Sequence, residues 1–311
     1  MTRIDGFLII DKYPKEIAYE HHKKTNHYWV NINGEEYYFK PTNFYYNELL
    51  AYHTAKFLGI EACYTDLAIL NGEKGIISKS LRKNEKTLIS GHEIIKEYIY
   101  KSFGNLLYTK KMIQNSGIIN WIFDKKYREK KDICAEYINN LEIIWQILED
   151  KYKNDPRFNV KTIMHKFVLM YIFTILVYDC DRYACNWLIQ ETNNNISLAP
   201  LFDNEDAFNY THQKMSQNTN PKFTINTETS DYNQLASLKV FLTNSSTEYL
   251  ELFTHYFEEL SENFNLIIER AETQIKKEIP ENIKTKILYN FNINKNQIQN
   301  ILNKFNHKKR H

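Results

Sequence analysis

The sequence predicts an α+β protein in which a small β-rich lobe is followed by a larger, mainly helical lobe. Short β-rich runs joined by Asn-Gly turns occupy the first 80 or so residues, and long helical periodicities follow from about residue 90. With 311 residues, of which 43% are apolar, the chain is long enough to bury a substantial core. We expect an N-terminal lobe over residues 1–82 and a helical lobe over residues 83–311, with the connection near residues 80–88.

Two pairs of β-rich runs predict two hairpins in the N-terminal lobe. The paired runs are 28–33 with 36–40, and 65–70 with 75–78. Asn33-Gly34 separates the first pair and Asn71-Gly72 the second. Asn-Gly between alternating strands is the strongest short-range hairpin signal, because both residues tolerate positive φ.

One helix is expected between these hairpins. Apolar residues have helical spacing from residue 44 to residue 58. Asn43 is placed to cap the amino end of this helix, and Gly59 supplies a stop at its carboxyl end.

The remainder of the chain predicts long helices interrupted by one short β insert. The helical periodicities cover 137–152, 161–178 and 248–276, and the β-like runs are 186–189 and 196–198. The apolar run 167–178 predicts a buried helix, and the polar stretch 210–231 predicts a mobile loop.

The composition limits the kinds of binding partner and the cellular compartment that we expect for this protein. Forty basic and 38 acidic residues leave a formal net charge of +2, which gives no bulk attraction to nucleic acid or to anionic lipid. The four cysteines have no metal-ligand spacing, and no apolar run reaches the roughly 20 residues needed to cross a bilayer. We therefore expect a cytoplasmic protein with no nucleic-acid partner and no stable membrane association; secretion without a signal peptide, as an effector, stays open.

The segments 178–189 and 198–204 carry the residues most suited to chemistry. Asp181-Arg182 is followed by Asn186, five positions beyond the aspartate, and a short hairpin then leads to Asp203. Phosphoryl transfer needs a carboxylate that accepts the proton of the attacking hydroxyl, and oxygen ligands that hold Mg²⁺ against the ATP phosphates. We assign Asp181 as the catalytic base, Asn186 and Asp203 as metal ligands, and Arg182 as electrostatic support for the loop.

The N-terminal lobe supplies the complementary charge. Lys40 ends a predicted strand, where its ammonium can reach the α- and β-phosphates of ATP. Glu48 lies near the start of the following helix and can pair with Lys40 to fix its position.

Each of these residues also has a structural interpretation. A lysine at a strand end is usually solvated, and a glutamate on a helix is usually a surface charge. Asp179 and Asp181 can form an Asx-turn and a helix cap. We give Asp179 only a loop-shaping role and expect its replacement by alanine to be mild.

At these residues the sequence resembles the HipA-like serine/threonine kinases, including their compact single-chain CtkA-type members. The similarity rests on four segments: 39–41 (Phe-Lys-Pro), 47–60 (Asn-Glu-Leu-Leu-Ala-Tyr with Leu-Gly-Ile), 181–187 (Asp-Arg-Tyr-Ala-Cys-Asn-Trp) and 198–203 (Leu-Ala-Pro-Leu-Phe-Asp). It implies a two-lobed protein-kinase-like fold with ATP in the cleft and Mg²⁺ bound by Asn186 and Asp203. It also implies a protein substrate with a Ser or Thr acceptor, a toxin or effector role, and autophosphorylation; an antitoxin partner stays open.

The sequence departs from the pattern of this family in three places. Tyr183 stands where the family usually has histidine, and only Thr25-Asn26-His27 or the Asn33-Gly34 turn can serve as the phosphate loop. No serine precedes residue 78, so autophosphorylation in that loop would need Thr25 or Thr42.

Two competing functions remain. Type II phosphatidylinositol 4-kinases share the Phe-Lys-Pro and Asp-Arg-x-x-x-Asn-Trp motifs, so a lipid kinase is the first alternative. A catalytically weak, nucleotide-binding pseudokinase is the second, because of Tyr183 and the missing glycine loop.

Overall fold

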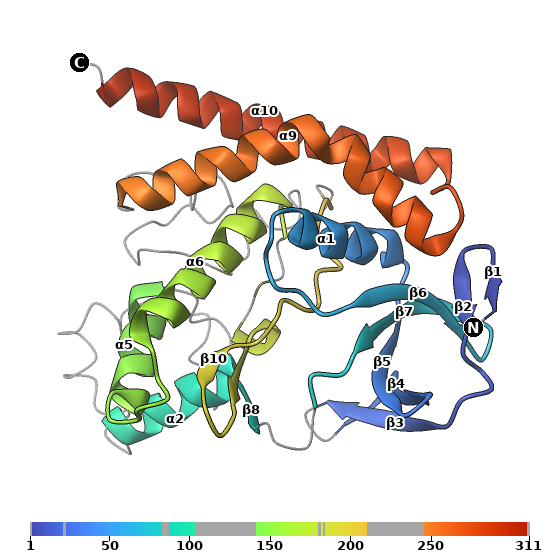
Figure 1. Ribbon diagram of the computed structural model, residues 1–311, viewed down its shortest axis with the longest axis horizontal. Coiled ribbons are helices and arrows are strands. Elements are labelled where there is room, and N and C mark those ends of the chain that lie inside the picture. Colours follow the sequence, from blue (N-terminus) through green and yellow to red (C-terminus); the bar gives the residue numbers. More distant parts are fainter. Residues whose placement is uncertain are drawn as a thin grey trace, which may run out of the picture.

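The computed structural model describes residues 2–20, 23–82, 87–103, 141–179, 182, 184–209 and 246–309. Seven strands of the amino-terminal part form one sheet in the order β1-β2-β6-β7-β5-β4-β3, antiparallel except where β2 lies parallel to β6 (Figure 1). These strands are β1 (Arg3–Ile4), β2 (Phe7–Ile9), β3 (Lys15–Glu20), β4 (Lys23–Ile32), β5 (Glu35–Pro41), β6 (Thr65–Leu70) and β7 (Glu73–Lys79).

Both predicted hairpins are confirmed. Strand β4 pairs with β5 and β6 pairs with β7, each antiparallel. Asn33 and Gly34 have φ values of 53° and 84°, and Asn71 and Gly72 have 54° and 79°. Two successive residues with positive φ are what a two-residue turn of type I′ requires, which explains why Asn-Gly marks both.

The predicted helix is also present, but Asn43 does not cap it. Helix α1 (Tyr45–Phe57) has Phe44 at its N-cap position, without a side-chain cap bond. The hydroxyl of Thr42 accepts a hydrogen bond from the Phe44 amide at 3.0 Å. Gly59 adopts φ of 70° just beyond the carboxyl end, as a helix-stop glycine does.

The structure extends the first hairpin beyond its predicted limits. Residues 25–27 lie inside strand β4, which begins at Lys23, so Thr25-Asn26-His27 is not a loop. The β3–β4 connection falls instead at residues 21 and 22, which lie outside the described residues. Strand β3 alternates charged and apolar residues too weakly to be predicted.

A second, three-stranded sheet has the order β10-β9-β8. Its strands are β8 (Thr87–Ser90), β9 (Leu188–Glu191) and β10 (Ile196–Leu198). The predicted β insert is therefore confirmed from residue 188 onward, whereas Asn186 belongs to a single 3₁₀ turn, η4 (Ala184–Asn186). Strand β8 was not predicted. It lies just after the connection between the two parts of the chain and pairs antiparallel with β9.

The described residues of the carboxyl-terminal part include the helices α2 (Gly91–Phe103), α5 (Leu141–Tyr152), α6 (Val160–Leu176), α9 (Thr247–Ile275) and α10 (Glu281–Lys309). Helix α6 is the predicted buried helix, and from Phe167 to Leu176 only Leu169 escapes full burial. Asn159 caps it by accepting a bond from the Thr162 amide at 3.0 Å. The predicted loop 210–231 lies outside the described residues.

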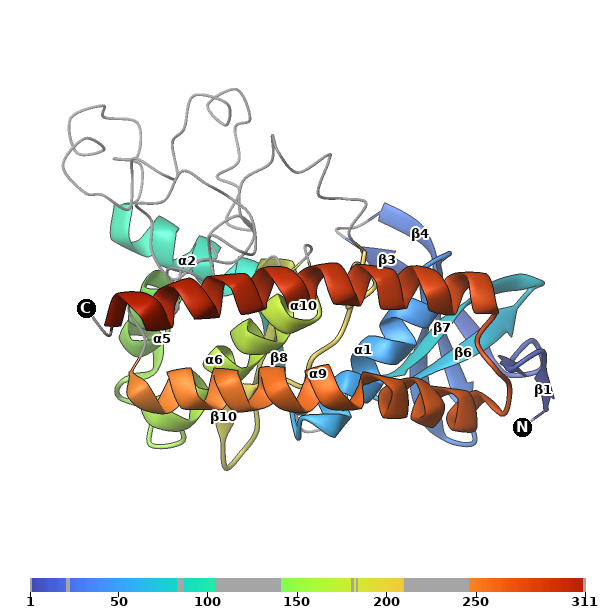
Figure 2. The same ribbon diagram turned by 90° about the horizontal axis from the view of Figure 1, so that it is seen from above.

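Helices α9 and α10 lie side by side along the length of the molecule (Figure 2). Helix α9 packs on α6 of the helical part and on α1 and β6 of the sheet part. Gln274 donates to the backbone oxygen of Thr65 at 2.9 Å, and Lys277 forms a 2.7 Å ion pair with Asp5. The main apolar core accordingly runs through both parts without a break.

We predict that replacing Gly75 with alanine will loosen the strand that carries Lys40. Gly75 of β7 lies opposite Pro41 of β5, and a Cβ atom there would overlap the backbone carbonyl oxygen of Lys40. Because that neighbour is backbone and cannot rotate away, we expect a loss of roughly 1–3 kcal/mol in the free energy of unfolding, measured with urea. Glu73→Ala, in the same strand at an exposed position, is the control; equal stability of the two variants would contradict the prediction.

Candidate functional site

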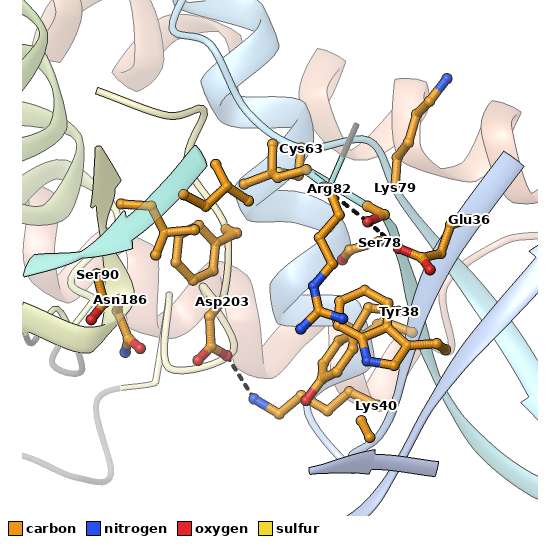
Figure 3. Close-up of a pocket in the computed structure, with 18 of the residues that line it drawn as sticks. Glu36, Tyr38, Lys40, Cys63, Ser78, Lys79, Arg82, Ser90, Asn186 and Asp203 are labelled. Atoms are coloured by element: carbon orange, nitrogen blue, oxygen red, sulfur yellow. Dashed lines mark hydrogen bonds and ion pairs between the residues drawn. The ribbon is translucent and has the colours of Figure 1, made fainter. Parts of the chain in front are cut away.

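A cleft of about 1530 Å³ lies between the seven-stranded sheet and the second sheet. The sheet side contributes Tyr38 and Lys40, and the opposite side contributes Asn186 and Asp203 (Figure 3). Trp29 of β4 also lines the cleft. Residues 79–82, at the end of β7 and just beyond it, also line the cleft. Residues far apart in sequence are therefore brought to one concave surface of the kind that binds small ligands.

Lys40 lies in this cleft, but its predicted pairing with Glu48 is not formed. Among the described residues, its ammonium forms ion pairs with Asp203 at 2.6 Å and with Glu205 at 3.0 Å. Burial disfavours the charged amine, but the two carboxylates outweigh this effect and raise the pKa of Lys40 above its ordinary value. Lys40 is thus a fixed positive charge at the cleft wall.

Glu48 is fully buried and faces the segment that follows Asp203. Its carboxyl group accepts hydrogen bonds from the Asn204 backbone amide at 2.5 Å and from the Asn204 side-chain amide at 3.3 Å. Burial, together with the negative charge of Asp203, raises the pKa of Glu48 to about 8. The raised pKa favours the neutral form of Glu48, and a neutral carboxyl group is a poor partner for an ammonium.

Arg182 connects the two predicted metal ligands. Its guanidinium donates to the backbone oxygens of Asn186 at 2.9 Å and of Phe202, the residue before Asp203, at 2.8 Å. It also donates to the side chain of Asn204. One planar side chain with several donors thereby holds both loops of the site.

Asp203 adopts an unusual backbone conformation, with φ of 54°. A non-glycine residue in this region is uncommon and is retained where the surrounding contacts fix it. Two residues earlier, the Leu201 amide donates to the Glu61 oxygen at 2.9 Å, and the Leu201 oxygen accepts from the Cys63 amide at 2.7 Å. These bonds fix the backbone just before Asp203 against the connection that precedes β6.

Asp181, the predicted base, lies outside the described residues, as does Tyr183. Asp179 is described, and it is more than a loop-shaping residue. Its carboxylate is fully buried and forms a 2.5 Å ion pair with the equally buried Arg182. This buried ion pair leads us to expect a large effect of Asp179→Ala on stability.

The sequence did not point to Trp29 and Arg82, which line the cleft, or to Glu205, which contacts the cleft residue Lys40. The Arg82 guanidinium stacks over the Trp29 ring, with its central carbon 4.1 Å from the ring centroid. Glu205 accepts a hydrogen bond from the Thr42 hydroxyl at 2.9 Å in addition to its ion pair with Lys40. The only indication of Glu205 in the sequence is its position two residues after Asp203. Its contact with Lys40 depends on the tertiary fold.

A strand lysine facing an aspartate across a cleft, with a small sheet and one helix on one side and a helical part on the other, defines the two-lobed protein-kinase-like fold. Comparison with solved structures agrees. The crystal structure of the Helicobacter pylori proinflammatory kinase CtkA superposes with a TM-score of 0.61 at 16% identity, over 97% of this chain and 99% of that one.

A chain of the Shewanella oneidensis MR-1 complex of the toxin–antitoxin proteins HipA and HipB with operator DNA gives a TM-score of 0.55 at 12% identity. That match covers 93% of this chain and 64% of the other, so this chain spans about two thirds of its length. The fold of the HipA-like kinases, expected from the sequence resemblance, is confirmed.

Comparison by sequence adds nothing to this result, since no protein-family model and no curated protein matches the chain. None of the helices in the described ranges is long and apolar enough to cross a membrane.

We predict that Asp179→Ala will be strongly destabilising. The substitution leaves the Arg182 guanidinium buried without its carboxylate, and breaking a buried ion pair from one side costs about 3–5 kcal/mol. Urea unfolding should show this loss. Asp150→Ala, which removes an exposed aspartate of α5, is the control, and a similar small change in both variants would refute the role given to Asp179.

We predict a pH-dependent stability term from Glu48. The folded protein keeps a proton on Glu48 up to about pH 8, whereas the unfolded chain releases it near the ordinary pKa of 4.5. The free energy of unfolding therefore falls as pH rises through this window, by roughly 1 kcal/mol per pH unit from this residue. Glu48→Gln should show a shallower fall than the wild type in urea titrations between pH 5 and pH 8; parallel curves would contradict the raised pKa.

Proposed function

We propose that this chain is an ATP- and Mg²⁺-dependent protein serine/threonine kinase of the HipA-like type. The observation that carries the proposal is the pairing of Lys40 with Asp203 across the cleft, at 2.6 Å, in a fold shared with a kinase over 97% of this chain. In this proposal residues 1–82 form the ATP-binding lobe and residues 83–311 the catalytic lobe.

The cleft residues fit a magnesium nucleotide. Mg²⁺ binds few protein oxygens and completes its shell with water and phosphate oxygens. The described residues contain no cluster of three acidic, histidine or cysteine side chains that could hold a metal by themselves, but Asn186 and Asp203 both line the cleft. These two side chains would hold Mg²⁺, which when bound neutralises charge on the transferring phosphoryl group.

The other groups have separable roles in this proposal. Lys40 would bind the phosphates, and Arg182 would keep Asn186 and Asp203 in position through their backbones. Asp181 would accept the proton of the acceptor hydroxyl. Trp29 and Tyr38 give the sheet side of the cleft an aromatic surface, which suits a nucleobase.

The acceptor and the biological role rest on the resemblance and on the relatives. The CtkA structure is described as a proinflammatory kinase, and the HipA chain comes from a toxin–antitoxin complex. By this analogy we propose a Ser or Thr acceptor on a protein, autophosphorylation, and a cytoplasmic toxin or effector role. An antitoxin partner belongs to the same proposal.

The test is incubation of the purified protein with labelled ATP and Mg²⁺, followed by detection of self-labelling and of labelled proteins in a cell lysate. Asp181→Ala and Asp203→Ala should each lower the rate by about 10²-fold or more, because the proposal gives each of them a direct role in the transfer. Asp150→Ala is the matched surface control. Calorimetry should show weaker Mg-ATP binding for Asp203→Ala but not for Asp181→Ala.

The outcomes separate the alternatives. Transfer to phosphoinositide vesicles and not to protein would identify a lipid kinase. Binding of Mg-ATP without transfer to any acceptor would identify a pseudokinase, and a wild type that binds no Mg-ATP would refute the proposal.

A further inference from the structure

We propose that Glu205, and not the helix residue Glu48, is the carboxylate that positions Lys40 for the nucleotide phosphates. This inference rests on the proposed function and refines it, because it assigns a positioning residue that the sequence motifs do not contain.

Lys40 has two carboxylate partners, and the proposed function gives only one of them, Asp203, a second role as a metal ligand. Its ammonium lies 2.6 Å from Asp203 and 3.0 Å from Glu205. In the proposed function Asp203 is engaged as a metal ligand. Glu205 then remains as the carboxylate within ion-pair distance that can orient the ammonium.

Glu48 is engaged elsewhere. Both of its oxygens accept hydrogen bonds from Asn204, one from the backbone and one from the side chain. Its burial, with Asp203 nearby, favours the protonated form. A buried carboxyl group with both oxygens bonded to Asn204 acts on the site through that residue, whereas the ion pairs of Lys40 are with Asp203 and Glu205.

Glu205 is itself held in place. The Thr42 hydroxyl donates to Glu205 at 2.9 Å and accepts from the Phe44 amide at 3.0 Å, at the start of α1. The side chains of Lys40 and Glu205 are 16% and 28% exposed, so the pair is shielded but borders the cleft. A chain of three contacts therefore runs from the start of α1 through Thr42 and Glu205 to Lys40.

The first experiment measures the reactivity of Lys40 in nucleotide-free protein, which does not depend on kinase activity. An amine-reactive probe labels only the neutral amine, and mass spectrometry reports the labelling rate at Lys40. Loss of one carboxylate partner should lower the pKa of Lys40, and each unit raises the neutral fraction tenfold. We expect Glu205→Gln to raise the rate about threefold or more, and Glu48→Gln to raise it less than Glu205→Gln does.

Thr42 offers a matched pair of variants. Thr42→Val removes the hydroxyl that holds Glu205 and should raise Lys40 labelling, whereas Thr42→Ser keeps the hydroxyl and should not. Unchanged labelling in Glu205→Gln, or an equal or larger rise in Glu48→Gln, would overturn the inference.

The second experiment measures ATP-dependent transfer. Glu205→Gln should lower kcat/KM for ATP by about tenfold or more, with Glu205→Asp retaining part of the activity. An active wild type whose Glu205→Gln variant keeps its full activity would refute this inference alone. A wild type that neither binds nor uses ATP would instead refute the proposed function.

Discussion

The site depends on a buried positive charge. The Arg182 side chain is fully buried, and a guanidinium in that environment is tolerated only when it is paired and hydrogen-bonded. Asp179 supplies the opposite charge, and the backbone oxygens of Asn186 and Phe202 supply acceptors. Satisfying this single group therefore requires the turn at η4 and the segment after β10 to meet, which places Asn186 and Asp203 on the same cleft.

The same network reaches the amino-terminal sheet. Arg182 donates to the Asn204 side chain, and Asn204 donates to Glu48 on α1. Asn47, the preceding residue of α1, donates to the backbone oxygen of Ala207 at 2.6 Å. Polar contacts thus bind α1 to the segment after Asp203 from two adjacent positions, so the lysine-bearing sheet and the loops of the helical part are held in one arrangement.

Local patterns in the sequence were sufficient for much of the fold. The Asn-Gly turns predicted both hairpins because positive φ at two successive residues is a local requirement. The apolar run of α6 predicted a buried helix because burial on all sides leaves no polar face. Strand β8 was missed because four residues carry too little periodicity to stand out.

Which side chains form ion pairs in the site could not be predicted from local patterns. Spacing alone suggested Glu48 for Lys40, since the two are eight positions apart, but the observed partner Asp203 is 163 positions away. Asp179 looked like a turn residue because its burial against Arg182 depends on the packing of the whole helical part. Which of several acids meets a given base is decided by tertiary contacts, and the sequence only limits the candidates.

The long helix α9 has a consequence for how the cleft can change shape. Its 29 residues extend over about 44 Å, and its two ends are attached to different halves of the protein. A rigid-body rotation of one half relative to the other would have to bend α9 or break its packing against α1. In the proposed function, nucleotide entry would therefore depend on local movement, such as that of the exposed Arg82 side chain beside Trp29, rather than on a hinge opening of the whole molecule.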